Sequence, residues 1–411
     1  MDLWVSVVIF LSKLIVSPAF LILIIVLGVM LYIKNQRISS MQKAIMGREI
    51  DSPLELTLSQ IVLGVFAGLI SSIIFSYLGI VFYDNYAIYI MFLFSMVLGF
   101  FNRRFICFSY SVPVVGILSI VLNSAGYKEV NIDITALVTM IGVLHVVEAL
   151  LTVLDGSKGS IPIFTQKNDK IMGGFVLRRN WIVPLSVLIF SSSGSILKLP
   201  SLWPLINTDV LRNIPLLFAP FVSIMGYSSI TFTKTRKEKT ALSGISIFFY
   251  GIFIICIAQV ANINIFFKCW VLFMVPIAHE FIFIFWNYME LKGKAKFVSD
   301  DEGMMVLAVV PDSPAEKMGI RCGDKLIEVD NGSKVYKKED ILNSLQSTAK
   351  SILVKIKRAA GNIENIKYTD ITQGDSLGIL FVPRDVPKNG TAVSIKKDSF
   401  KDVLNKFKDK K

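Results

Sequence analysis

The sequence predicts a polytopic α-helical membrane domain of about nine spans, followed by a soluble α+β domain and a short basic tail. Hydrophobic residues make up 53% of the 411 residues and charged residues only 18%, whereas soluble domains contain about 25% charged residues. Charge is also unevenly distributed: residues 292–411 carry 23 Lys and Arg and 17 Asp and Glu, against 20 and 14 in residues 1–291. We therefore place the membrane domain at residues 1–291, the soluble domain at 292–386 and the tail at 387–411.

Nine mostly apolar runs predict membrane-spanning helices, since a helix needs about 20 residues to cross the hydrocarbon core and somewhat fewer with interfacial flanks. The first run is too long for one upright helix. Lys13 and Pro18 interrupt it, which predicts a kinked span, or an interfacial segment followed by a span from Pro18. No basic segment or small-residue cleavage site precedes it, so we do not interpret it as a signal peptide. The runs lie near residues 5–33, 57–82, 86–101, 106–122, 133–152, 181–197, 214–232, 241–261 and 267–288.

Basic residues in the loops predict the orientation of the spans, because cytoplasmic loops are enriched in Lys and Arg. One set of alternate loops contains 15 of these residues and the other set contains four. With nine spans, this bias predicts an external N-terminus and a cytoplasmic C-terminal domain. Topology and attraction to anionic lipid also account for the formal net charge of +12 without a nucleic-acid partner.

The longest cytoplasmic loop, residues 155–180, contains two apolar stretches on either side of Lys167-Asn168-Asp169-Lys170. This pattern indicates a hairpin turn, and Gly173-Gly174 is a candidate bulge. Two interpretations remain open: a solvated connector, and a small hairpin that docks another part of the protein.

Short strands and turns replace the long apolar runs after residue 296. Ser313 is placed to cap a short helix that begins at Pro314. Asp330-Asn331-Gly332 suits a tight turn, because these residues tolerate a positive φ. A second helix is expected at Lys337–Ser347, and a final strand after Ser376.

The soluble segment resembles a bacterial PDZ domain over about 80 residues, because four motifs occur in the order typical of that family. The resemblance implies a small β-sandwich capped by two helices, which accepts an extended peptide as an added strand. The motifs are the strand Gly303–Val310, Asp312-Ser313-Pro314-Ala315 with Met318-Gly319-Ile320, Gly323-Asp324 with Leu326-Ile327, and Asp330-Asn331-Gly332.

The PDZ resemblance also implies a peptide groove between the strand after Ser376 and the helix Lys337–Ser347. Leu377-Gly378-Ile379 is similar to the carboxylate-binding loop of the family, located at the end as in permuted bacterial members. Ser376 replaces the first Gly of that pattern, so both a free C-terminus and an internal peptide remain open as ligands. Gly378 is expected to permit close approach of the peptide backbone. The implied groove wall consists of Leu377, Ile379, Ile341 and Leu345.

The whole architecture, a multispanning segment followed by one cytoplasmic PDZ domain, resembles MinJ-like topological determinants of bacterial cell division. Similarity in Gly173-Gly174-Phe175, Trp181–Pro184 and His145–Glu148 supports this weakly. The resemblance implies a non-enzymatic scaffold at the septum and poles, which links a DivIVA-like protein to MinC–MinD-like inhibitors of division. A PDZ-regulated membrane transporter or sensor is the alternative function.

Two histidines occur in predicted spans, each with a carboxylate nearby: His145 with Glu148, and His279 with Glu280. His145 and Glu148 share a helix face at i and i+3. Both spans run in the same direction, and both histidines lie a little past the midpoint, so the four residues are expected to form an intramembrane polar cluster. A structural contact between helices, a metal or proton site, and placement of Glu148 at the interface remain open interpretations.

No motif in the sequence indicates an enzyme or a cofactor. Intramembrane metalloproteases use two His at i and i+4 around a Glu, but Phe283 occupies the position of the second ligand after His279-Glu280. Leu154-Asp155-Gly156 resembles their second motif only as a tripeptide. The four cysteines have no spacing typical of a zinc site or a disulfide framework.

The tail contains a short amphipathic pattern at residues 398–411, with Phe400, Val403, Leu404 and Phe407 on one helical face and lysines around them. Both a frayed solvated end and a helix that binds anionic lipid or a partner are consistent with this pattern.

Overall fold

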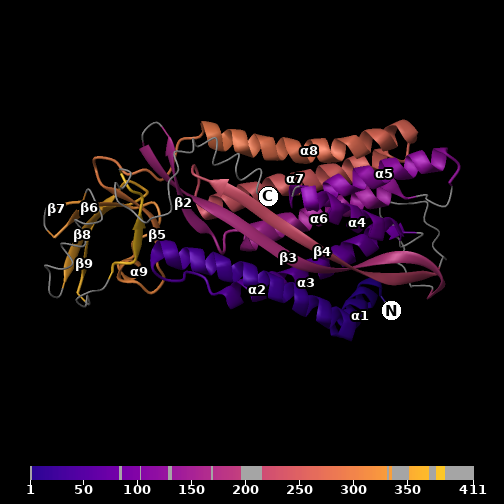
Figure 1. Ribbon diagram of the computed structural model, residues 1–411, viewed down its shortest axis with the longest axis horizontal. Helices are drawn as coiled ribbons and strands as arrows, with labels where there is room; N and C mark the ends of the chain where they lie inside the picture. Colours follow the sequence, from indigo (N-terminus) through magenta and orange to yellow (C-terminus); the bar gives the residue numbers. More distant parts are fainter. Residues whose placement is uncertain are drawn as a thin grey trace.

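The computed structural model shows a bundle of helices with a long pair of strands running through it, and the C-terminal domain lies at one end of the bundle (Figure 1). The predicted tail, residues 387–411, and the predicted helix Lys337–Ser347 lie outside the described part. The described residues are 2–82, 86–101, 103–127, 132–167, 170–195, 215–330, 333–335, 351–369 and 376–384.

Helices form most of the membrane domain. Within the described residues, α2, α3, α6, α7 and α8 are long and apolar enough to cross a membrane, while α1, α4 and α5 are shorter apolar helices. The predicted interruption of the first run is confirmed, because α1 ends at Val16 and Pro18 opens α2, where its missing N–H removes no helical bond. The helices are α1 (Leu3–Val16), α2 (Pro18–Met46), α3 (Pro53–Leu78), α4 (Tyr86–Phe101), α5 (Phe108–Ser124), α6 (Ile134–Asp155), α7 (Arg236–Val260) and α8 (Ile265–Lys292), with the 3₁₀ turn η1 (Arg103–Ile106) before α5.

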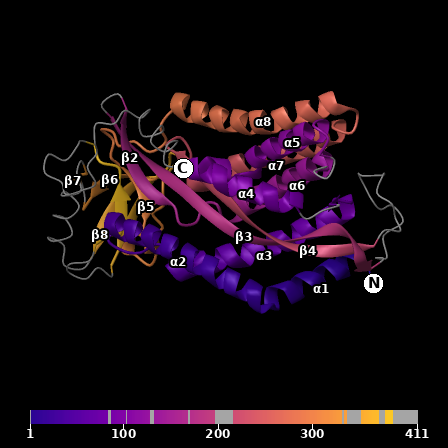
Figure 2. The ribbon, with the colours of Figure 1, turned by 45° about the vertical axis from the view of Figure 1, so that its right-hand side comes forward.

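Two of the nine predicted helical spans are wrong, because residues 181–197 and 214–232 lie largely in strands. β3 (Lys170–Ser195) pairs antiparallel with β4 (Leu216–Thr231) from Phe175 opposite Thr231 to Phe190 opposite Leu216. β3 starts and β4 ends at the end of the bundle that carries the C-terminal domain (Figures 1 and 2). The strand pair therefore leaves this end and returns to it, as two helical spans would, so the side predicted for each later loop is unchanged.

One face of α3 covers an edge of β3. Gly64, Gly68 and Ser72 recur every four residues and so share this face. A Cβ atom on Gly64 would lie 2.0 Å from the carbonyl oxygen of Ile182, and one on Gly68 would lie 1.8 Å from that of Pro184. The Ser72 hydroxyl accepts a 2.8 Å hydrogen bond from the backbone N–H of Ser186. Strand edges within a membrane domain must be shielded from lipid by protein, and the small residues of α3 permit that.

The predicted hairpin in the loop 155–180 is confirmed. β2 (Ile161–Lys167) pairs antiparallel with the start of β3, and Lys167 lies opposite Lys170. The suggested bulge at Gly173-Gly174 is wrong, because both glycines pair in regular register with Phe164 and Ile163. Their lack of side chains instead serves close packing, since a Cβ on Gly174 would lie 2.4 Å from a ring carbon of Phe232.

Among its described residues, the C-terminal domain contains an antiparallel sheet and a one-turn helix. The strands follow the order β10-β5-β6-β8-β9, and β7 pairs with β6. The strands are β5 (Met304–Val309), β6 (Lys325–Val329), β7 (Ser333–Lys334), β8 (Ile352–Lys357), β9 (Ile363–Tyr368) and β10 (Ile379–Phe381), and the helix is α9 (Pro314–Lys317).

Candidate functional site

The loop before β10 is held against the start of α9. The Ser313 side chain caps α9 by accepting a 3.3 Å hydrogen bond from the N–H of Glu316, as its sequence position predicts. The carbonyl groups of Leu377 and Gly378 accept hydrogen bonds from the N–H groups of Ala315 and Val310, at 3.1 and 2.8 Å. These contacts fix the loop that leads into β10.

β10 presents one unpaired edge among the described residues, where β5 is its only partner strand. Gly378 bonds to β5 through its carbonyl group, and Val382 through its N–H, which donates to Met305 at 2.9 Å. Backbone groups of alternate residues in an antiparallel pair point to opposite sides. The N–H and C=O groups of Ile379 and Phe381 therefore point away from β5, toward the position of an added strand.

The predicted groove residues that the structure describes differ in burial and in the residues they contact. Leu377 is 5% exposed and packs in the core of the C-terminal domain, while Ile379 is half-buried against that core. Gly378 has φ +73°, and a Cβ there would lie 2.4 Å from the Cβ of Ser313. The structure shows a close approach of Gly378 to the α9 cap. Its expected role in the approach of a peptide backbone stays a prediction. Ile341 and Leu345 lie outside the described residues.

The β2–β3 hairpin docks the C-terminal domain onto the membrane domain, one of the two interpretations left open for this loop. The N–H of Gly173 donates a 2.9 Å hydrogen bond to the carbonyl group of Phe297. A Cβ on Gly173 would lie 2.8 Å from side-chain atoms of Leu307 and Val382. Phe297, Leu307 and Val382 are fully buried within the same hydrophobic cluster as α6 and β3. The C-terminal domain thus shares part of the core of the membrane domain.

The Cys322 thiol is expected to react slowly with alkylating reagents. Burial raises its pKa to about 11, although nearby Arg236 and Lys296 act in the opposite direction. The thiolate is the reactive species, so below pH 9 the rate should increase about tenfold per pH unit and stay roughly 100-fold below that of the unfolded chain, whose thiol keeps the ordinary pKa of 9.0. Alkylation of a variant that retains only this cysteine, with and without denaturant, measures both rates. Equal rates would contradict the burial.

The two histidines meet inside the membrane domain. His145 on α6 and His279 on α8 have ring centroids 5.8 Å apart, and the ring of Tyr250 on α7 lies 4.8 Å from His145 and 5.6 Å from His279. Tyr110 on α5 lies between His279, whose Nδ1 is 3.0 Å from the hydroxyl oxygen, and the carboxylate of Glu280, to which the hydroxyl donates. Glu148 has a carboxylate oxygen 3.9 Å from Nε2 of His145. The four predicted residues are therefore grouped around Tyr110 and Tyr250.

Cys107 belongs to the same group, although its sequence position gave no indication of this. Its Sγ lies 3.4 Å from Nε2 of His145, and ligand atoms of Cys107, His145 and His279 all lie within 4.8 Å of one another. A cavity of about 380 Å³ reaches these residues from a wall that includes Lys34, Arg178 and Lys239. Hydropathy alone could not reveal that Cys107 belongs to this group, because the cysteine precedes α5 and approaches the histidines only in the folded bundle.

The structure also contains two buried ion pairs that the sequence did not predict. Asp155, at the end of α6, accepts 2.8 and 2.9 Å hydrogen bonds from Nε of Arg179 and Nε1 of Trp181 on β3, and the side chains of Asp155 and Arg179 are fully buried. Lys239 on α7 lies 3.1 Å from Glu290 on α8, and both are 2% exposed. The Asp of Leu154-Asp155-Gly156 thus joins α6 to the strand pair.

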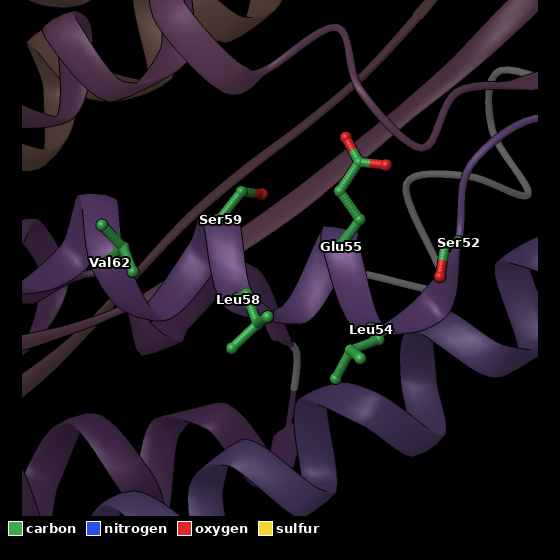
Figure 3. Close-up of a pocket in the computed structure, with 6 residues that line it drawn as sticks. All are labelled: Ser52, Leu54, Glu55, Leu58, Ser59 and Val62. Carbon is green, nitrogen blue, oxygen red and sulfur yellow. The ribbon is translucent and has the colours of Figure 1, made fainter.

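A shallow depression on α3 has no comparable chemistry. Leu54, Leu58 and Val62 line it and are about half exposed, and Ser52, Glu55 and Ser59 complete the lining (Figure 3). Exposed apolar side chains on a spanning helix are the expected lipid contact.

Comparison with known proteins assigns a family to part of the chain. No curated protein matches the sequence. Residues 305–358, from β5 through β8, match a family model described as a PDZ domain. The C-terminal domain of this membrane protein therefore contains a PDZ domain.

Proposed function

We propose that this protein is a non-enzymatic membrane scaffold that captures partner proteins by adding an extended peptide to the edge of β10. The outward N–H and C=O groups of Ile379 and Phe381 are the observation that carries this proposal, because PDZ domains bind peptides through such an edge. The side chain of Leu380 packs against the cluster of the membrane domain, while Phe381 packs in the PDZ core. A peptide added there would be held in a fixed orientation relative to the membrane.

The partners we propose are division-site proteins, by resemblance to MinJ-like determinants: a DivIVA-like protein and MinC–MinD-like inhibitors. The excess of Lys and Arg in one set of alternate loops supports a cytoplasmic location for the PDZ domain. The proposed partners are located on the same side of the membrane. Basic residues at that side attract anionic lipid. On this proposal the membrane domain positions the PDZ domain at the septum and poles of a bacterial cell.

A proline substitution tests the β10 edge. Ile379→Pro removes one N–H that points away from the sheet, so selected peptides should bind the full chain about tenfold more weakly, the effect of a lost hydrogen bond together with poorer strand geometry. Ile363→Pro is the matched control, because Ile363 is 58% exposed on the opposite edge strand, β9. The N–H of Arg358 on the neighbouring chain segment donates to the carbonyl group of Asn362. Because backbone groups alternate in direction along a strand, the N–H of Ile363, the next residue, points outward.

The measurement is peptide affinity for the full chain in lipid nanodiscs, using peptides selected on the unsubstituted protein. Thermal unfolding of each variant checks that the fold persists. Equal affinities for folded Ile379→Pro and Ile363→Pro would place the peptide elsewhere and refute the proposed edge.

A sensor or transporter is the second candidate, because one observation favours it. The cavity of about 380 Å³ is large enough to hold water, and it is lined in part by a cluster of Cys, His, Glu and Tyr side chains inside the membrane domain. Ionisable residues at such depth are uncommon unless they serve binding or transport. A scaffold needs no such cavity, whereas a sensor or a transporter does.

A further inference from the structure

We infer that Cys107, His145 and His279 form a zinc site. The Glu148 carboxylate lies outside this group of three, with one oxygen 3.9 Å from Nε2 of His145, and would rotate toward the ion to become the fourth ligand. This inference goes beyond the scaffold function and does not depend on it. The three residues come from the position just before α5, from α6 and from α8, so a bound ion would connect three segments of the chain.

The distances suit a tetrahedral ion. Zinc binds Cys sulfur at about 2.3 Å and His nitrogen at about 2.0 Å, which places two such ligand atoms about 3.5 Å apart. Sγ of Cys107 and Nε2 of His145 are separated by 3.4 Å. All three ligand atoms lie within 4.8 Å of one another, so small side-chain rotations bring the third atom to the same separation.

Hydrogen bonds to the other ring nitrogens orient both histidines as ligands. Nδ1 of His145 lies 2.8 Å from the carbonyl oxygen of Ile141, which can only accept, so Nδ1 carries the proton and Nε2 keeps its lone pair. The Tyr110 hydroxyl donates to Glu280, so its oxygen accepts from Nδ1 of His279. Metal-bound histidines typically donate their second N–H to a carbonyl group or a carboxylate network in this way.

Charge balance favours a divalent ion at this depth. A thiolate from Cys107 and a carboxylate from Glu148 together neutralise Zn²⁺, and the two imidazoles are neutral. A group with zero net charge is the arrangement that a low-dielectric interior tolerates best. Binding releases the Cys107 proton to water in the cavity. A thiolate with two imidazoles is a soft ligand set, which selects zinc over magnesium or calcium.

Metal content of the full chain tests this site directly. Protein purified in detergent without chelator and dialysed against micromolar Zn²⁺ should contain about one zinc ion per chain. Cys107→Ser and His279→Gln should each lose at least nine-tenths of it. Cys256→Ser is the matched control, because Cys256 is an exposed cysteine on α7 outside the cluster, and it should retain the full content.

A conservative variant and a spectrum separate coordination from simple packing. His279→Gln keeps a hydrogen-bonding group but ligates metal poorly, so loss of zinc in this variant reports coordination rather than packing. Co²⁺ added to the unsubstituted protein should give a thiolate charge-transfer absorption that Cys107→Ser lacks. Zn²⁺ should raise the melting temperature of the unsubstituted protein and of Cys256→Ser, but not of Cys107→Ser. An unsubstituted protein that binds neither ion, or equal binding by Cys107→Ser, would overturn the inference.

Discussion

Replacing Asp155 with alanine should destabilise the folded protein by about 3–5 kcal/mol, because it leaves the Arg179 guanidinium buried without its counter-charge. Asp155 accepts hydrogen bonds from Arg179 and Trp181 of β3, so the substitution also removes the link between α6 and the strand pair. The expected result is a large loss of protein from the membrane and a lower melting temperature of the remainder.

Lys158→Ala is the matched control for that substitution. Lys158 also faces Asp155, at 3.7 Å, but its side chain is 44% exposed, and exposed ion pairs contribute about 0–1 kcal/mol. The double substitution Asp155→Leu with Arg179→Met should recover part of the lost stability, since two apolar side chains need no ion pair, while Nε1 of Trp181 still lacks its acceptor. Equal melting temperatures for Asp155→Ala and Lys158→Ala would contradict the role of the buried pair.

Replacing Gly68 with valine should destabilise the membrane domain by about 3 kcal/mol or more, at or beyond the upper end of typical overpacking effects. The new Cβ would lie 1.8 Å from the carbonyl oxygen of Pro184, and a backbone atom of a paired strand cannot move aside as a side chain can. α3 would have to separate from β3 and expose the strand edge to lipid. Thermal unfolding of the detergent-solubilised protein measures the effect.

Gly28→Ala provides the comparison for Gly68. A Cβ at Gly28 on α2 would lie 3.3 Å from the terminal methyl group of Ile61, which can rotate. This variant should unfold within a few degrees of the unsubstituted protein. A similarly mild effect of Gly68→Val would show that α3 does not cover β3 as described.

The long strand pair is the main feature that the sequence could not reveal. Residues 181–197 and 214–232 are mostly apolar runs, and an apolar strand in a membrane domain, whether buried like β3 or partly exposed like β4, has the same hydropathy as a spanning helix. Pro184 in the first run and Pro215 and Pro220 in the second were the available signals against helices. The pattern of Gly64, Gly68 and Ser72 on α3 acquires meaning only once its strand partner is known.

Local motifs predicted the C-terminal domain more successfully. The cap at Ser313 and the strand that follows Gly303 are set by neighbouring residues, so their structure follows from sequence position. Gly378 shows the limit of that approach: its motif is local, but its close contact is with Ser313, 65 positions earlier. The grouping of Cys107 with the histidines likewise depends on how α5, α6 and α8 pack.

The location of a fluorescent fusion in dividing bacteria tests the scaffold function most directly. We expect the full chain to gather at division septa and cell poles, Ile363→Pro to do the same, and Ile379→Pro to spread evenly around the membrane at equal abundance. An even distribution of the unsubstituted protein, or septal gathering of Ile379→Pro equal to that of the control, would contradict it.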